Sequence, residues 1–118
     1  MTRRSFRLRR VPAGPTFAAV FKNGARCKDA LLLVCAAPNT QAHARLGVNV
    51  ARKVASKAVA RNRIKRQLRE TFRHHQDDVA NLDVVVIAQA GAGVADNVAL
   101  CNALREHLKK IAHKCKKS

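Results

Sequence analysis

The chain has 118 residues, with 24 Lys or Arg against 7 Asp or Glu, and its formal net charge is +17. Such a length supports one domain spanning residues 1–118, and so large a positive charge indicates a polyanionic partner, of which nucleic acid is the first candidate. No run of about 18 apolar residues occurs, so we expect no contact with a membrane and a cytoplasmic location.

The start of the chain is predicted to be a basic arm followed by a short helix. Residues 1–13 contain five Arg and no apolar period, which is typical of a flexible arm that takes its shape from a partner. The same Arg-rich start could belong to an organellar transit peptide, but it leads directly into a patterned segment. That segment predicts a helix over 15–24, because Phe17, Val20 and Phe21 recur at helical spacing and a glycine follows.

Apolar patterning predicts three strands further along the chain. Residues 30–37 are apolar on both faces and end at a proline, as expected of a buried strand closed by a turn. Residues 46–50 alternate large apolar side chains with small or polar ones, which is typical of a strand with one buried face. Residues 82–90 supply another apolar run and the last of these strands.

Helical periodicity returns in the last part of the chain. Asp96 is placed as an N-cap, and an apolar stripe follows it, made of Leu100, Leu104, Leu108 and Ile111. The order of elements predicts an α/β (α+β) two-layer sandwich, in which a small mixed sheet of about four strands packs against three helices.

The remaining predicted helix is the basic segment between the second and third strands. Nine Lys or Arg fall between Arg52 and Arg73, with Glu70 as the only acid. At about 100° per residue one arc of this helix is suited to packing, and it contains Ala60, Ile64, Leu68, Thr71 and Phe72. The cations on the other side repel one another and oppose the helix dipole, a conflict that bound phosphates would relieve. A merely solvated face would interleave Glu with Lys, so the pattern indicates nucleic-acid binding without separating RNA from DNA.

The acidic and thiol side chains predict no catalytic site, no metal site and no cofactor bound by the protein alone. The four cysteines contain no C-x-x-C pair, so we expect reduced, packed thiols. Glu70 and His74 stand one turn apart, and Asp77, Asp78 and Asp83 follow, but their spacing makes no two-metal carboxylate cluster.

One segment, residues 45–73, reads RLGVNVARKVASKAVARNRIKRQLRETFR and closely resembles the signature of the bacterial ribonuclease P protein subunit family. The Arg-Asn-Arg core of that signature is residues 61–63. FAAVFKNG at residues 17–24 and DVVVIAQA at residues 83–90 fall in the order of the family, so the resemblance covers nearly the whole chain. It implies that the basic helix lies in a left-handed crossover between parallel strands, against the usual preference.

The resemblance also implies an activity. The protein would be a monomer that binds one catalytic RNA and the precursor tRNA, and would assist endonucleolytic removal of the 5′ leader. The RNA would carry the chemistry, and the RNA–protein complex would require Mg²⁺.

Two groups of site residues are implied by the resemblance. The RNA-binding group comprises Arg52, Lys53, Arg61, Asn62, Arg63, Lys65, Arg66 and Arg69. The cleft that grips the leader comprises Phe17, Phe21, Cys35, Asn49, Lys65 and Arg69. Spacing alone would instead place the two Phe in a core with Val20.

The chain departs from the family pattern at two places. Cys35 stands where the family often has an aromatic residue, so a stacking contribution of about 1–3 kcal/mol would be missing. Ala55 and Ser56 stand where the family commonly has a glycine before the basic helix, which leaves the start of that helix open by a residue or two.

Two other protein classes share this charge and size. A ribosomal RNA-binding protein would copurify with ribosomal subunits, whereas a ribonuclease P subunit would follow one catalytic RNA. An architectural DNA protein would bind duplex DNA as tightly as folded RNA at equal salt.

Overall fold

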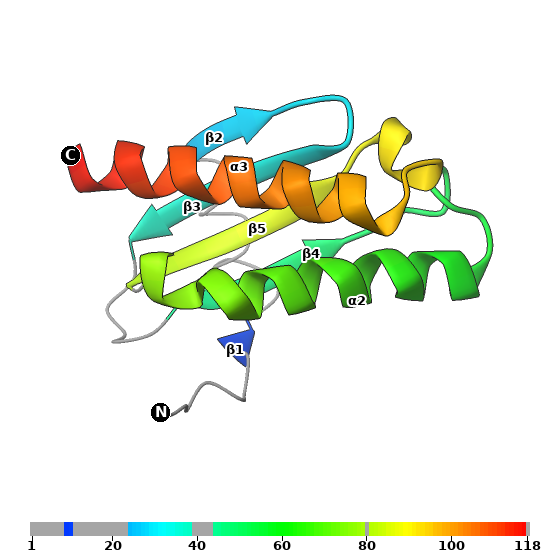
Figure 1. Cartoon of the computed structure of the whole chain (residues 1–118), viewed down its shortest axis with the longest axis horizontal. Helices are drawn as coiled ribbons and strands as arrows, with labels where there is room; N and C mark the ends of the chain where they lie inside the picture. The colour runs from blue at the N-terminus through cyan, green and yellow to red at the C-terminus, as the bar shows by residue number, and fades with distance from the viewer. Residues whose placement is uncertain (1–8, 11–23, 39–43, 80, 118) are drawn as a thin grey trace.

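The computed structural model describes residues 9–10, 24–38, 44–79 and 81–117, and within them five strands form one mixed sheet in the order β1-β4-β5-β3-β2 (Figure 1). The strands are β1 (Arg9–Arg10), β2 (Ala25–Lys28), β3 (Leu32–Pro38), β4 (Arg45–Asn49) and β5 (Leu82–Ala88). The central strand β5 pairs in parallel with β4 and antiparallel with β3. The three strands predicted from apolar patterning are confirmed, and β2 and the two-residue β1 add to them.

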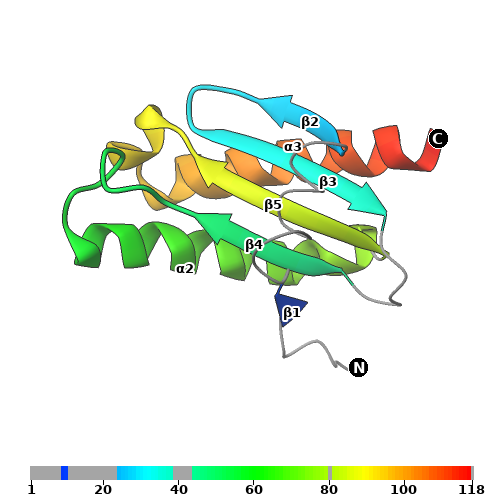
Figure 2. The ribbon, with the colours of Figure 1, turned by 180° about the vertical axis from the view of Figure 1, so that it is seen from behind.

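Two α-helices of the described chain, α2 (Ala58–His75) and α3 (Asn97–Lys117), lie side by side on one face of the sheet (Figures 1 and 2). Two short 3₁₀ helices, η1 (Gln76–Val79) and η2 (Ala90–Gly93), flank β5. The layered α/β architecture is therefore as predicted. Of the three predicted helices, the first, over 15–24, lies outside the described residues except for its last position.

The predicted arm, residues 1–13, is described only at Arg9 and Arg10. These two residues pair in parallel with Arg45 and Leu46 of β4. Backbone pairing therefore joins Arg9 and Arg10 to the edge of the sheet, and the flexibility of the arm stays a prediction. The other residues of the arm lie outside the described chain.

The main core lies between the helices and the sheet. On α2 the buried residues are Ile64, Leu68, Thr71 and Phe72, which confirms the packing arc drawn from periodicity, with Ala60 half-buried at its edge. On α3 the predicted stripe is also buried, with Leu100, Leu104, Leu108 and Ile111 at most 2% exposed. These side chains meet alternate residues of β3 and β5, among them Leu32, Val34, Val84 and Val86. Burial of this apolar surface is what docks two strongly charged helices onto the sheet.

The connection from β4 through α2 to β5 has the left-handed sense implied by the resemblance. In Figure 1 both parallel strands run to the right, α2 lies on the near side of the sheet, and β5 lies above β4. A right-handed crossover, the form found in nearly all such units, would place β5 below β4 in this view. The left-handed path sets the basic helix over the β4 side of the sheet, with α3 on its other flank.

Candidate nucleic-acid interface

The solvent side of α2 presents a row of polar and cationic side chains, the basic face, which we define as Asn62, Arg66 and Arg69. All three are exposed and stand on successive turns of the helix. The one acid of the helix, Glu70, pairs with Arg73 at 2.5 Å. No acid of the described chain lies within ion-pair distance of Arg66 or Arg69. Their guanidinium groups are free to make bidentate contacts with phosphate.

The entry loop, residues 51–57, carries further cations to the N-terminal end of α2. Arg52 and Lys53 are exposed in this loop. Arg61 holds the loop in place, because its Nη1 donates to the backbone oxygens of Ala55 at 3.0 Å and Ser56 at 2.8 Å. Nη1 of Arg61 is thus engaged within the protein, and the side chain is half-buried.

Close packing against η2 fixes the same loop from the other side. A Cβ added at Gly93 would lie 2.1 Å from the backbone oxygen of Val54, so only glycine allows this approach. The N-cap of α2, Lys57, makes no side-chain capping hydrogen bond. The first backbone N–H groups of α2 therefore lack a side-chain cap at the positive end of the helix dipole, beside the loop cations.

Arg63 is also used within the fold. Its Nη1 donates to Oδ1 of Asn97 at 2.6 Å, and its Nη2 donates to the backbone oxygen of Ala95 at 3.3 Å. These bonds join α2 to the start of α3. Within the Arg-Asn-Arg core Asn62 is exposed and the two arginines are half-buried, a difference that the charge pattern could not predict.

Of the six residues predicted for the leader cleft, the structure describes four. Phe17 and Phe21 lie outside the described residues. Cys35 packs against Val85 in a second apolar cluster, separate from the core beneath the helices. Asn49 is exposed at the end of β4 and is the register partner of Ile87, which packs against the same cluster.

The two cationic members of the predicted cleft, Lys65 and Arg69, stand on α2 in the helix layer. Lys65 is half-buried and Arg69 is exposed. Cys35 is fully buried, and burial raises the pKa of its thiol, although the nearby charge of Arg26 opposes this shift. Cys35 is therefore a neutral packing residue, and the cleft as a complete group of six remains a prediction.

An ion pair between half-buried Arg45 and buried Asp83 ties β4 to β5, and the sequence pattern did not predict it. Arg45 donates from Nε to Oδ1 of Asp83 at 2.7 Å and from Nη2 to Oδ2 at 2.6 Å. The hydrogen bonds that Arg45 donates to Asp83 raise the pKa of Arg45 above its ordinary value, outweighing partial burial. The sequence did contain one indication of this pair, because Asp83 lies inside an apolar strand. A carboxylate that becomes buried there requires a partner.

Three thiols are free: those of Cys27 and Cys35, which are buried, and that of Cys101, which is half-buried. Cys101 accepts a hydrogen bond from Oγ1 of Thr71 at 3.0 Å, between α2 and α3. The described residues contain no group of three His, Cys, Asp or Glu that could hold a metal ion. No helix in the part of the chain that the structure describes is long and apolar enough to cross a membrane.

Comparison with known proteins identifies the family. The family model Ribonuclease P matches residues 4–112. The chain is 43% identical over 100 residues to the Ribonuclease P protein component of Idiomarina loihiensis, covering 84% of this chain and 80% of that one. The RNase P protein of Staphylococcus aureus has a TM-score of 0.79 at 31% identity, covering 87% of this chain and 94% of that one. The RNase P protein from Thermotoga maritima has a TM-score of 0.77 at 30% identity, covering 86% and 96% respectively. A chain with these matches over most of its length belongs to the ribonuclease P protein family.

Proposed function

We propose that this chain binds the catalytic RNA of ribonuclease P and the 5′ leader of precursor tRNA, and assists removal of that leader. Proteins of its family are components of an endoribonuclease complex whose partner is the ribonuclease P RNA. The observation that carries the proposal is the basic face of α2, where Arg66 and Arg69 are exposed with no ion-pair partner among the described residues. A surface with this many unpaired cations is stabilised by phosphates, which neutralise them and release counterions.

The predicted RNA-binding residues divide into two roles. The exposed residues Arg52, Lys53, Asn62, Arg66 and Arg69 contact RNA, with half-buried Lys65 at their edge. Arg61 and Arg63 act as positioning residues, because each donates to backbone oxygens of its own chain. Arg61 sets the entry loop against α2, and Arg63 sets α3 against α2.

The chemistry belongs to the RNA in this proposal. The chain supplies no catalytic residue, and Mg²⁺ is a requirement of the RNA–protein complex. One monomeric protein binds one RNA in the cytoplasm. The protein increases discrimination for precursor over mature tRNA, because the predicted cleft holds the leader through Phe17, Phe21, Cys35, Asn49, Lys65 and Arg69.

The decisive assay is cleavage of the 5′ leader from a precursor tRNA by a bacterial ribonuclease P RNA at low Mg²⁺, with and without the protein. A gain that depends on the protein, with no cleavage by protein alone, is the expected result. Tight, salt-sensitive RNA binding without any gain would favour a ribosomal or general RNA-binding role instead. Equal or tighter binding to duplex DNA would favour an architectural DNA protein.

A double variant tests the leader cleft separately. Phe17→Ala with Phe21→Ala should weaken binding of precursor tRNA and leave mature tRNA unchanged, because only the precursor carries the leader. Equal losses for both tRNAs would refute the cleft assignment. Glu70→Ala and Asp78→Ala serve as controls in the cleavage assay, since neither acid has a role in the proposed chemistry.

A further inference from the structure

His107 is a buried, ionisable side chain in the middle of α3, and the proposed function does not use it. Its side chain is only 4% exposed. Its Nε2 lies 3.0 Å from Oδ2 of Asp29, which stands in the turn that joins β2 to β3. Buried polar groups are normally satisfied by hydrogen bonds, so the surroundings of this ring decide what it does in the fold.

Asp29 organises the turn between β2 and β3. Its Oδ1 accepts hydrogen bonds from the backbone N–H of Leu31 at 2.7 Å and from that of Leu32 at 2.8 Å. Its own backbone N–H donates to the backbone oxygen of Leu32 at 2.9 Å. One carboxylate oxygen thus fixes the conformation of the turn, while the other faces His107 and joins the turn to α3.

The carboxylate of Asp29 is ionised at neutral pH. Its side chain is 42% exposed. Partial burial raises the pKa of Asp29, but the N–H groups of Leu32 and Leu31 and the charge of His107 lower it overall below its ordinary value. A negative charge is therefore held against the buried ring throughout the range in which histidine side chains change their charge, about pH 5–8.

The contact between the two side chains is electrostatic rather than a hydrogen bond. Although Nε2 and Oδ2 are 3.0 Å apart, neither ring nitrogen of His107 makes a hydrogen bond of good geometry with a described residue. A neutral imidazole leaves both nitrogens buried without a partner, which costs the desolvation of each. A protonated imidazole also loses hydration, but the nearby carboxylate attracts its charge. The strength of the contact therefore depends on the charge of His107.

The sheet brings no second acid to this ring. Among the described residues, Asp29 is the one acid within ion-pair distance of His107. On β2, Cys27 is buried toward the helices, and the exposed cations Arg26 and Lys28 alternate with it on the other face. The side chains of β3 that belong to the core beneath the helices are apolar.

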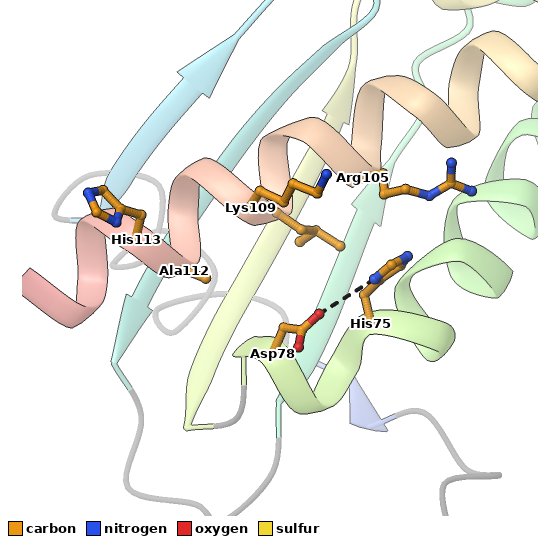
Figure 3. Close-up of a pocket in the computed structure, with 7 residues that line it drawn as sticks. His75, Asp78, Arg105, Lys109, Ala112 and His113 are labelled. Atoms are coloured by element: carbon orange, nitrogen blue, oxygen red, sulfur yellow. Dashed lines mark ion pairs between the residues drawn. The ribbon is translucent and has the colours of Figure 1, made fainter.

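The helices contribute no competing partner either. On α3, Glu106 and Lys110 stand on either side of His107 along the chain, and both are exposed. The titratable groups that α2 and η1 bring to α3 lie around a pocket on its other flank (Figure 3). The titratable residues lining that pocket are His75, Asp78, Arg105, Lys109 and His113.

The turn held by Asp29 also supports η2 and, through it, the entry loop. The backbone oxygens of residues 30 and 31 accept hydrogen bonds from the N–H groups of Gly91 at 3.1 Å and Gln89 at 2.8 Å. On its other side η2 packs against the entry loop at Gly93. The turn, η2 and the entry loop are therefore packed in series at one end of the sheet (Figure 1).

We propose that His107 and Asp29 form a pH-sensitive latch, which holds the β2–β3 turn against α3 while the imidazole is protonated and loosens it when the imidazole is neutral. Because the turn supports η2, the latch also sets how firmly η2 and the entry loop are held. The inference goes beyond the proposed function, since the latch acts in the free protein and requires neither the catalytic RNA nor tRNA.

The first test is a double-mutant cycle with His107→Gln and Asp29→Asn, measured by urea unfolding of the whole protein and followed by circular dichroism. Asn keeps an oxygen for the two N–H groups of the turn, and Gln keeps a polar side chain that does not titrate. The coupling of the two residues should change the folding equilibrium constant by roughly fivefold or more at about pH 5, and by less than about twofold at about pH 8. Equal coupling at the two pH values would overturn the proposal.

His113→Gln is the matched control for this cycle. His113 is exposed on the same helix, and no acid of the described chain lies within ion-pair distance of it. Its coupling to Asp29 should stay below about twofold at both pH values. A coupling as large as that of His107 would show a general effect of charge on α3 and would contradict the latch.

The second test begins with the wild-type protein and needs no substitution. The amide proton shifts of Leu31 and Leu32, which donate to Asp29, should show a step within the range in which histidine titrates, about pH 5–8. The step should vanish in His107→Gln and persist in His113→Gln. Absence of the step in the wild-type protein, or its persistence without His107, would overturn the proposal. Failure of the protein to stimulate ribonuclease P RNA would refute the proposed function and leave these results unchanged.

Discussion

Arg63 provides a sharp test of the division between positioning and contact residues. Its guanidinium makes two hydrogen bonds to the start of α3, one to Asn97 and one to the backbone oxygen of Ala95. Each such bond contributes about 0.5–1.5 kcal/mol, and the bond to Asn97 is exposed, so Arg63→Ala should cost about 1–2 kcal/mol of unfolding free energy. For a domain of this size that corresponds to a fall in Tm of roughly 4–8 °C, measurable by thermal circular dichroism.

The matched variant is Arg66→Ala, one turn along on the exposed side of α2. Its Tm should change little, because no ion pair or hydrogen bond within the described chain is lost, and an exposed substitution costs at most about 0.5 kcal/mol. Its RNA affinity should fall by up to roughly tenfold, and the slope of log affinity against log salt should fall by about 0.7–1, the value for one phosphate. The opposite pattern would refute the reasoning: an unchanged Tm with a reduced salt slope for Arg63→Ala would place that guanidinium on RNA.

Three further predictions concern stability. Asp83→Ala should cost about 1–3 kcal/mol in urea unfolding, because half-buried Arg45 would lose the carboxylate that accepts two hydrogen bonds from it, and an unchanged unfolding midpoint would show that the pair is solvated. Gly93→Ala should cost about 1–3 kcal/mol, because its Cβ would meet the backbone oxygen of Val54 at 2.1 Å, and an unchanged unfolding midpoint would contradict that contact. Partial burial raises the pKa of Asp29, but the N–H groups of Leu32 and Leu31 and the charge of His107 lower it overall below its ordinary value of 3.8. The stability from Asp29 is therefore present above that value and lost as pH falls through the lower folded pKa, so Asp29→Asn should flatten the acid side of the pH–stability curve.

The sequence predicted most of the fold because most of its elements are specified locally. The apolar stripes of α2 and α3 repeat at helical spacing, and the side chains they select, from Ile64 to Ile111, are the buried ones. Strand β2 was not predicted, because it is four residues long and its cations alternate with Ala25 and Cys27. Its pairing is decided by β3, which supplies every one of its register partners.

Roles within the basic segment could not be predicted from the sequence for a different reason. An arginine fork donates equally well to a phosphate or to a backbone oxygen, and only the fold decides which acceptor lies within reach. Arg61 meets oxygens six and five residues earlier in the chain, whereas Arg63 meets oxygens more than 30 residues later. Neither the contacts of Arg61 nor those of Arg63 can be predicted from composition or periodicity.

The distribution of these contacts also explains how a helix with nine nearby cations is stable without RNA. Arg61 and Arg63 donate to oxygens of the protein, and Arg73 pairs with Glu70. These bonds offset part of the repulsion that the charge pattern predicts, and apolar burial on the opposite arc supplies the rest. The other six cations, from Arg52 to Arg69, have no carboxylate within ion-pair distance among the described residues. Their repulsion persists in the free protein, so phosphate binding should stabilise the fold itself, and Tm should rise with RNA at low salt more than at high salt.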